Sequence, residues 1–282
     1  LDADGQPVNT TVAIATDSSG FTDADAKVEA LAGGGFVVVW RSDRGDSDIY
    51  ARVFDAAGNS VGGEVPVNLG NSVYDLVPQV TALTGGGFAV TWHSTSHSDS
   101  STDNDIYARV FSPTGSPVTA GEIVVSNNNP WYDSGPQISQ LSNGGFVVTW
   151  YADRADDGSL DGNIYARVYN AAGTAVTAEI TVSPENTIYD YLPEVTVLTG
   201  GRFAITWSGN NGELYARVYE ANGGAVSSLT VVNPVDAITD NSPKIAALAG
   251  GGFAVSWYAA RTAAGGSDAD QNVFVRLFDV NG

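Results

Sequence analysis

The sequence predicts an all-β protein, a five-bladed β-propeller of four-stranded antiparallel blades, and three observations predict it. A repeat of roughly 50 to 60 residues occurs five times, each copy holds four short strand patterns separated by turn residues, and no segment has a helical period. The copies align on a glycine turn followed by Phe-x-x-x-Trp. The pattern ends at five tryptophans, Trp40, Trp92, Trp150, Trp207 and Trp257.

Each repeat is expected to form its strands in a fixed order. The first strand runs into a glycine turn, as at 80–87, and the second strand, 36–40, is apolar on both faces. The third strand follows at 49–54 and the fourth at 64–68, after a second turn. A second strand that is apolar on both faces must be covered on both sides, which stacked sheets around an axis provide. A β-helix has shorter coils, and a two-sheet sandwich does not explain five copies.

The two ends of the chain predict that the ring is closed by the N-terminal strand. Residues 1–8 match the turn at 54–61, residues 11–15 match a fourth strand, and the chain ends just after a third strand. Pairing these ends would remove two exposed sheet edges. We therefore expect a single domain, 1–282, with 1–16 completing the last blade and the blades at 17–68, 69–126, 127–183, 184–233 and 234–282.

The charge of the chain excludes several partners. It has 12 Lys and Arg against 32 Asp and Glu, a net charge of −20 at pH 7, and no cysteine. Such a surface repels phosphate backbones and anionic headgroups, so we expect neither a nucleic acid nor a membrane partner. It attracts divalent cations. No signal peptide is recognisable at the N-terminus, and we expect a secreted or cell-surface monomeric domain within a longer bacterial chain.

The long, variable loops after strands two and four are the expected functional face, because function concentrates on variable loops of a rigid scaffold. Aromatic and basic residues gather there. Trp131, which lies outside the tryptophan series, either offers a flat platform to a sugar ring or covers the neighbouring blade. The candidate ligand-binding residues are Trp131, Tyr132, Tyr189, Tyr74, His93, Tyr151, Arg44, Arg154 and Arg261.

Two residue series recur at equivalent positions and are expected to pair. The aspartates are Asp23, Asp75, Asp133, Asp190 and Asp240, and the strand-three arginines are Arg52, Arg109, Arg167, Arg217 and Arg276. A buried arginine needs a partner, so we expect a structural pair in each repeat. Repeated ligand contacts by the aspartates are the alternative, and the five recurring tryptophans are expected in the core.

Carboxylates crowd the loops between strands two and three, which is typical of calcium sites or of solvated turns. The candidate calcium ligands are Asp103, Asp105, Asp156, Asp157 and Asp161. No cluster follows the full helix-loop-helix calcium pattern. The chain has only two histidines, His93 and His97, and no cysteine, which argues against zinc.

The unit Gly-Gly-Gly-Phe-Val-Val-Val-Trp with Asp-Ile-Tyr-Ala-Arg-Val-Phe-Asp-Ala-Ala-Gly-Asn, at 33–40 and 48–59, resembles repeats of very large secreted bacterial proteins. Those proteins often carry haemolysin-type (RTX) calcium-binding nonapeptides and cadherin-like modules. The resemblance covers essentially the whole chain and implies type I export and a role in adhesion or polysaccharide contact. The chain has no nonapeptide array of its own, so calcium-driven β-roll folding is not implied. In architecture it is also similar to five-bladed lectins.

These observations lead to three functional hypotheses. The first is a non-catalytic, lectin-like carbohydrate-binding module of an extracellular adhesin or polysaccharide-associated protein. The second is a structural or protein-interaction module, and the third is a polysaccharide hydrolase or lyase acting at the channel mouth. Near that mouth only one of five equivalent residues is acidic; they are Lys27, Gln79, Gln137, Glu194 and Lys244. The visible repeat symmetry favours binding over catalysis, so we expect no enzyme activity.

Overall fold

The computed structural model describes residues 11–15, 20–70, 74–95, 104–126, 131–153, 162–184, 188–233, 240–261 and 270–282, and these residues form β-strands and turns but no helix. The all-β prediction is therefore confirmed. Neighbouring strands within each repeat pair antiparallel in chain order, and the strands of the second and third repeats join in one eight-stranded sheet through a parallel bridge between Asn104 and Tyr132. We call the strand groups of the five repeats blades 1 to 5.

The strands of the first three blades have the following bounds. Blade 1 holds β1 (Asp23–Ala30), β2 (Phe36–Asp43), β3 (Ser47–Phe54) and β4 (Val65–Pro66). Blade 2 holds β5 (Asp75–Ala82), β6 (Phe88–Thr95), β7 (Asn104–Phe111) and β8 (Ile123–Val124). Blade 3 holds β9 (Tyr132–Gln140), β10 (Phe146–Asp153), β11 (Asn163–Tyr169) and β12 (Ile180–Thr181).

The last two blades differ in strand number. Blade 4 holds β13 (Asp190–Val197), β14 (Phe203–Gly209), β15 (Leu214–Tyr219) and β16 (Thr230–Val231). Blade 5 holds β17 (Asp240–Ala247), β18 (Phe253–Arg261) and β19 (Asp270–Phe278), with no fourth strand among the described residues. The predicted fourth strands are shortened to two paired residues, although Val67 N–H still donates to Ile49 O at 2.8 Å.

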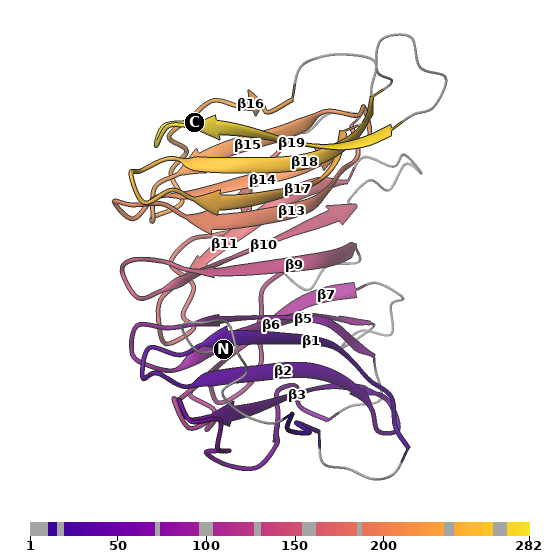
Figure 1. Cartoon of the computed structure of the whole chain (residues 1–282), viewed down its shortest axis with the longest axis vertical. Helices are drawn as coiled ribbons and strands as arrows, with labels where there is room; N and C mark the ends of the chain where they lie inside the picture. The colour runs from indigo at the N-terminus through magenta and orange to yellow at the C-terminus, as the bar shows by residue number, and fades with distance from the viewer. Residues whose placement is uncertain are drawn as a thin grey trace.

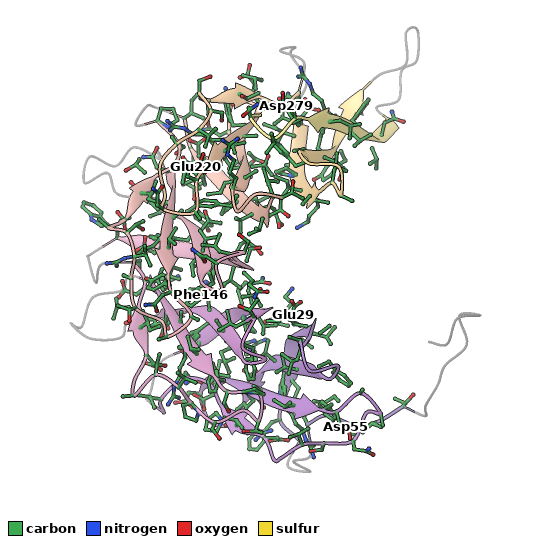
Figure 2. All side chains as sticks on the ribbon, turned by 90° about the vertical axis from the view of Figure 1, so that its left-hand side faces the viewer. Glu29, Asp55, Phe146, Glu220 and Asp279 are labelled. Atoms are coloured by element: carbon green, nitrogen blue, oxygen red, sulfur yellow. The ribbon has the colours of Figure 1, made fainter. Side chains whose placement is uncertain are left out.

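The blades stack face to face in chain order (Figure 1), and the stack is curved, with the first strand of each blade on the concave side (Figure 2). β5 packs against both β1 and β9, and β13 packs against both β9 and β17. The core lies between the blades: Trp92 and Tyr107 of blade 2, for instance, pack against Val39 of blade 1. This face-to-face burial on both sides of the second strand is the architecture of a β-propeller, as the sequence predicts.

A buried hydrogen-bond relay joins one blade to the next. Trp92 Nε1 donates to Asp75 Oδ1 at 2.9 Å, while Asp75 Oδ2 accepts from Asn68 Nδ2 at 2.8 Å. Asn68, which follows the last strand of blade 1, accepts from Ile49 N–H of that blade at 2.8 Å. One carboxylate thus ties the tryptophan of its own blade to the end of the preceding blade.

The complete relay recurs between blades 4 and 5, where Asn233 Nδ2 also donates to Asp240 Oδ2, and parts of it recur at the other interfaces. Trp150 and Trp257 donate to Asp133 and Asp240 at 3.0 and 2.9 Å. Ser126, Ser183 and Asn233 accept from the third-strand N–H groups of Ile106, Ile164 and Leu214. In blade 4, Trp207 Nε1 and Asp190 Oδ1 are buried without a hydrogen-bond partner among the described residues. Unpaired buried polar groups are costly, so the relay favours the packing of the blades where it is complete.

The structure corrects the expected pairing of aspartates with arginines. Arg109 Nη1 donates to the main-chain oxygen of Val67 in the preceding blade at 2.9 Å, and Arg217 Nη1 donates to that of Val182 at 3.2 Å. The aspartates accept from the tryptophans instead. The physical reason is position: the arginine reaches an outer-strand carbonyl, whereas the aspartate lies near the start of the inner strand, opposite the end of the second strand.

The interface at the front of blade 1 departs from the others. Ile14 O accepts from Arg52 Nη1 at 2.8 Å, so residues 11–15 lie where a preceding blade would place its fourth strand. The hydrogen-bond relay is missing here, because Ala15 occupies the position of the connecting Asn or Ser. Asp23 is exposed, and Trp40 Nε1 has no hydrogen-bond partner among the described residues. Residues 11–15 form no strand, and blade 5 lies apart from blade 1 in Figure 2.

We predict that the relay gives the protein a measurable pH dependence of stability. Burial raises the pKa of Asp75 from its ordinary 3.8 to about 7. The folded chain therefore keeps a proton that the unfolded chain loses, and the free energy of unfolding contributed by Asp75 falls as pH rises through that window. Asp75→Asn should lose less stability between pH 4 and pH 7 than the unchanged chain, measured by urea unfolding.

Asp55→Asn is the matched control, because Asp55 is exposed and its hydrogen bonds with Asn59 lower its pKa. Removing that carboxylate should leave the decline between pH 4 and pH 7 in place. An Asp75→Asn variant with the same decline as the unchanged chain would contradict the assignment.

Candidate functional site

A β-bulge interrupts every inner strand at the same place. In β9, Gln137 pairs with Thr149 and Ser134 pairs with Tyr151, so two residues of β9 oppose Trp150 alone. The same register shift occurs in β1, β5, β13 and β17. The first bulge residue has a left-handed backbone in all five strands; these residues are Asp25, Val77, Gly135, Leu192 and Ser242.

The second bulge residue explains why the regular strand pairing is interrupted here. It is proline in four of the five blades, at Pro78, Pro136, Pro193 and Pro243, and Ala26 in blade 1. Proline has no N–H to donate to a ladder, so it is confined to edges and bulges. A left-handed residue such as Val77, at φ 54°, costs about 1–3 kcal/mol and persists only where packing holds it. The bulges therefore determine which side chains of the inner strands face the concave side of the stack.

A pocket of about 240 Å³ lies where four of these bulges converge. Its lining comes from blades 2, 3, 4 and 5 and joins apolar bulge residues to a few polar groups, as ligand sites usually do. The residues are Val77, Gly135, Gln137, Tyr151, Leu192, Pro193, Glu194, Ser242, Pro243 and Lys244. We call it the axial pocket.

Among the residues that line the axial pocket, Glu194 is the one carboxylate, and it forms an ion pair with Lys244 of the next inner strand. The Glu194 side chain is 19% exposed and that of Lys244 is 70% exposed. Gln137 occupies the equivalent place in blade 3. The pocket therefore presents an acid, a cation and an amide at neighbouring positions, which suits hydrogen bonding to a polyhydroxylated ligand.

Tyr151 forms the wall of the axial pocket on the side of the loops. Its ring lies 3.0 Å from the position of a Cβ on Gly135, so the missing side chain at Gly135 makes room for the ring. Burial raises the pKa of Tyr151, and the phenol stays protonated as a hydrogen-bond donor. The ring contacts Tyr189 edge-on, with centroids 6.2 Å apart.

Two predicted ligand residues lie elsewhere. His93 is buried, its Nδ1 lies 3.0 Å from Ser134 Oγ, and burial lowers its pKa to about 4, so it is a neutral core residue. Arg44 pairs with Glu64 at 2.8 Å and stacks over the ring of Tyr50, on the outer side of blade 1. Internal partners thus occupy polar groups of both residues, and ligand binding by them stays a prediction.

The remaining predicted ligand residues divide into three groups. Tyr151 and Tyr189 adjoin the axial pocket and each other. Tyr132 and Tyr74 are exposed on the loop side of blades 3 and 2, and Trp131 is partly exposed beside Tyr132. Arg154 and the side chain of Arg261 lie outside the described residues.

The candidate calcium ligands are mostly outside the described residues as well. Asp103, Asp156, Asp157 and Asp161 belong to that group, while Asp105 is buried and accepts from Ser126 Oγ at 3.2 Å. Within the described ranges, no group of three or more His, Asp or Glu residues is placed to hold a metal ion. Calcium binding stays a prediction.

The sequence prediction missed the pocket as a unit, although its signal was present. The recurring X-Pro pair before the glycine turn, at 77–78, 135–136, 192–193 and 242–243, marks the bulges. Proline in a strand indicates an edge or a bulge, and bulges are common beside active sites.

The described residues contain no helix that is long and apolar enough to cross a membrane.

No protein-family model and no curated protein matches the chain, but solved structures do. A protein of unknown function from Dyadobacter fermentans has a TM-score of 0.58 at 10% identity, covering 92% of this chain and 79% of that one. The α-L-arabinofuranosidase of Fusarium graminearum with an iminosugar inhibitor scores 0.58 at 13% identity, covering 93% and 83%. The same Fusarium enzyme with arabinobiose scores 0.58 at 12% identity, covering 91% and 81%.

The comparisons correct the expectation of a non-catalytic, lectin-like module. That expectation rested on regular repeats and on a similarity of architecture to lectins, whereas the solved structures of this fold include glycoside hydrolases. Repeat symmetry is therefore no argument against catalysis in a chain of this shape. At this identity the likeness shows the β-propeller fold alone, because one fold supports many functions.

We predict that Gly135→Ala displaces the wall of the axial pocket. Gly135 has a left-handed backbone, so an alanine there adds backbone strain to the close contact of its Cβ with the Tyr151 ring, 3.0 Å away. Overpacking of this kind costs about 1–3 kcal/mol. Urea unfolding should show that loss, whereas Gly200→Ala, which is also left-handed but has open space around its Cβ position, should lose only the part that comes from backbone strain. Equal effects of the two substitutions would contradict the placement of Tyr151.

Proposed function

We propose that this protein is a glycoside hydrolase acting on a neutral glycan, with its reaction centre at the axial pocket. The observation that carries the proposal is Glu194, a largely buried carboxylate at the convergence of four strained bulges. Strained backbone that recurs beside a polar pocket is the pattern of a functional site. The fold shared with an α-L-arabinofuranosidase supports the proposal as analogy.

The charge of the chain selects hydrolysis of a neutral glycan over lyase chemistry. A polysaccharide lyase acts on a uronate chain, whose repeated carboxylates would be repelled by a surface of net charge −20. A neutral chain has no such penalty. Arabinan is the first substrate to test, since the Fusarium enzyme of the same fold holds arabinobiose.

Hydrolysis of a glycosidic bond uses two carboxyl groups, one that protonates the leaving oxygen and one that activates water or attacks the sugar. Glu194 supplies one of these two groups. Asp25 supplies the other, because it holds in β1 the bulge position that Val77, Gly135, Leu192 and Ser242 hold around the axial pocket. Asp25 is about half-exposed and pairs with Arg41 at 3.0 Å. In a closed ring, where blade 1 lies beside blade 5, the Glu194 and Asp25 carboxyl groups both face the axial pocket.

The proposed enzyme is therefore a closed, five-bladed ring in which residues 11–15 pair with β19. Ile14 already has the carbonyl contact of a fourth strand, and β19 lacks the partner that β3, β7, β11 and β15 have among the described residues. Val273, Val275 and Leu277 of β19 are 80%, 66% and 66% exposed. Their counterparts in blade 2, such as Ile106 and Ala108, pack against Trp150 and Tyr165 of the next blade. Blade 1 offers Trp40 and Tyr50 for the same contact.

Ring closure can be tested by a disulfide, because the chain has no cysteine of its own. Register in blade 1 pairs Ala51 with Val65, and the equivalent pair across the seam is Val275 with Val12. Val12→Cys with Val275→Cys should oxidise within one chain, detected as a faster-migrating monomer on a non-reducing gel. Ala51→Cys with Val65→Cys is the positive control. Disulfide-linked dimers without the monomer band would contradict closure.

Glu194→Gln should reduce the cleavage of arabinan by at least about 100-fold, because it removes the acid–base group and keeps the side-chain size. Asp25→Asn should have a comparable effect. The measurement is release of reducing ends from a panel of neutral polysaccharides that includes arabinan. Glu220→Gln is the matched control: Glu220 pairs with Arg202 and follows β15, away from the concave side (Figure 2).

Full activity of Glu194→Gln would contradict the assignment of the carboxylate. No release of reducing ends from any neutral glycan by the unchanged chain would contradict the proposed function itself.

A further inference from the structure

A row of tyrosines extends from the axial pocket across three blades. Tyr132 and Tyr151 come from blade 3, Tyr189 precedes β13, Tyr191 lies within β13, and Tyr258 comes from β18. Tyr151 and Tyr189 meet edge to face at 6.2 Å, and Tyr189 and Tyr191 meet at 5.9 Å between ring centroids. Tyr132 begins β9 opposite Asp153, and Tyr258 lies opposite Asn241, so these two tyrosines come from the loop ends of the strands on either side of the contacting rings.

Glycines in the neighbouring backbone make room for two rings of this row. A Cβ on Gly162 would lie 2.7 Å from Cε2 of Tyr189, and Gly135 leaves the equivalent room for Tyr151. The Gly162 carbonyl also accepts from the N–H of Asp190 at 2.7 Å, which holds the segment that carries Tyr189. Edge-to-face contacts restrict the rings further. The row is therefore a rigid surface rather than a set of independent side chains.

The row is also accessible at its ends. Tyr132 is 47% exposed and Tyr258 is 36% exposed, while Tyr151, Tyr189 and Tyr191 are partly buried. Burial raises the pKa of Tyr189 to about 12, so its phenol remains a neutral donor. Flat rings with protonated hydroxyls match a sugar, which presents an apolar ring face and hydroxyl groups.

We propose that the tyrosine row is the substrate-binding surface that holds several consecutive residues of a neutral glycan chain and leads it to the axial pocket. The inference rests on the proposed function and specifies its substrate: an extended chain rather than a single terminal sugar. Tyr151 belongs both to the row and to the pocket lining, so the chain passes from one to the other without a break. Tyr189 is the central contact.

The test is calorimetric binding to Glu194→Gln, which retains the row but is slow to cleave the ligand. The probes are arabinobiose and a linear arabino-oligosaccharide of about six residues. Tyr189→Ala and Tyr132→Ala in this background should weaken binding of the longer probe at least tenfold and of arabinobiose much less. Tyr189→Phe should bind nearly as well as the parent, since it keeps the ring.

Phe21→Ala is the control, because Phe21 is an aromatic residue that is 42% exposed before β1, outside the row and outside the candidate ligand residues. Thermal unfolding of each variant separates lost contacts from a lost fold. Unchanged affinity in both alanine variants, or no binding of the longer probe by Glu194→Gln, would overturn the proposal. Tyr189-dependent binding without cleavage by the unchanged chain would support the row and contradict the hydrolase.

Discussion

The structure depends on the buried aspartate near the start of the inner strand, which in blades 2 and 5 connects the tryptophan of its own blade to the end of the preceding blade. Asp75 accepts from Trp92 of its own blade and from Asn68 at the end of the blade before it. Burying a carboxylate is costly unless its oxygens have donors, so the blades must pack in the one arrangement that supplies these donors. Hydrophobic burial holds the sheets together, and this relay sets how each sheet is placed on the next.

The same constraint positions the candidate site. The aspartate of the relay begins the inner strand, and the two bulge residues lie directly opposite the tryptophan that the aspartate binds. The bulge therefore forms where the tryptophan is fixed, and it directs the following residues, Gln137, Glu194 and Lys244, toward the axis. A catalytic group at this place is carried by a rigid strand rather than by a mobile loop, which favours a well-defined geometry.

Much of the fold could be predicted from the sequence. Five copies of one pattern, with Trp40 and its counterparts on strands that are apolar on both faces, require stacked sheets. The pairing of Asp75 could not be predicted, because a strand pattern does not say whether a carboxylate meets an arginine or an indole N–H. His93 was assigned to the ligand face because it follows a tryptophan, whereas the packing of blade 3 against blade 2 buries it. For the axial pocket, Tyr151 and Tyr189 were identified as separate aromatics. Their contact depends on Gly135 and Gly162. The X-Pro pair marks Gly135 as a bulge residue, but no local pattern shows that either glycine makes room for a tyrosine ring.

The position of a bound glycan tests the account most directly. A crystal structure of the Glu194→Gln variant soaked with a linear arabino-oligosaccharide should show sugar rings along Tyr189 and Tyr151. A glycosidic bond should lie at the axial pocket, between the substituted side chain on β13 and the carboxylate of Asp25. A glycan bound on the outer hairpins, or a closed ring with an empty axial pocket and Asp25 turned away from it, would contradict the account.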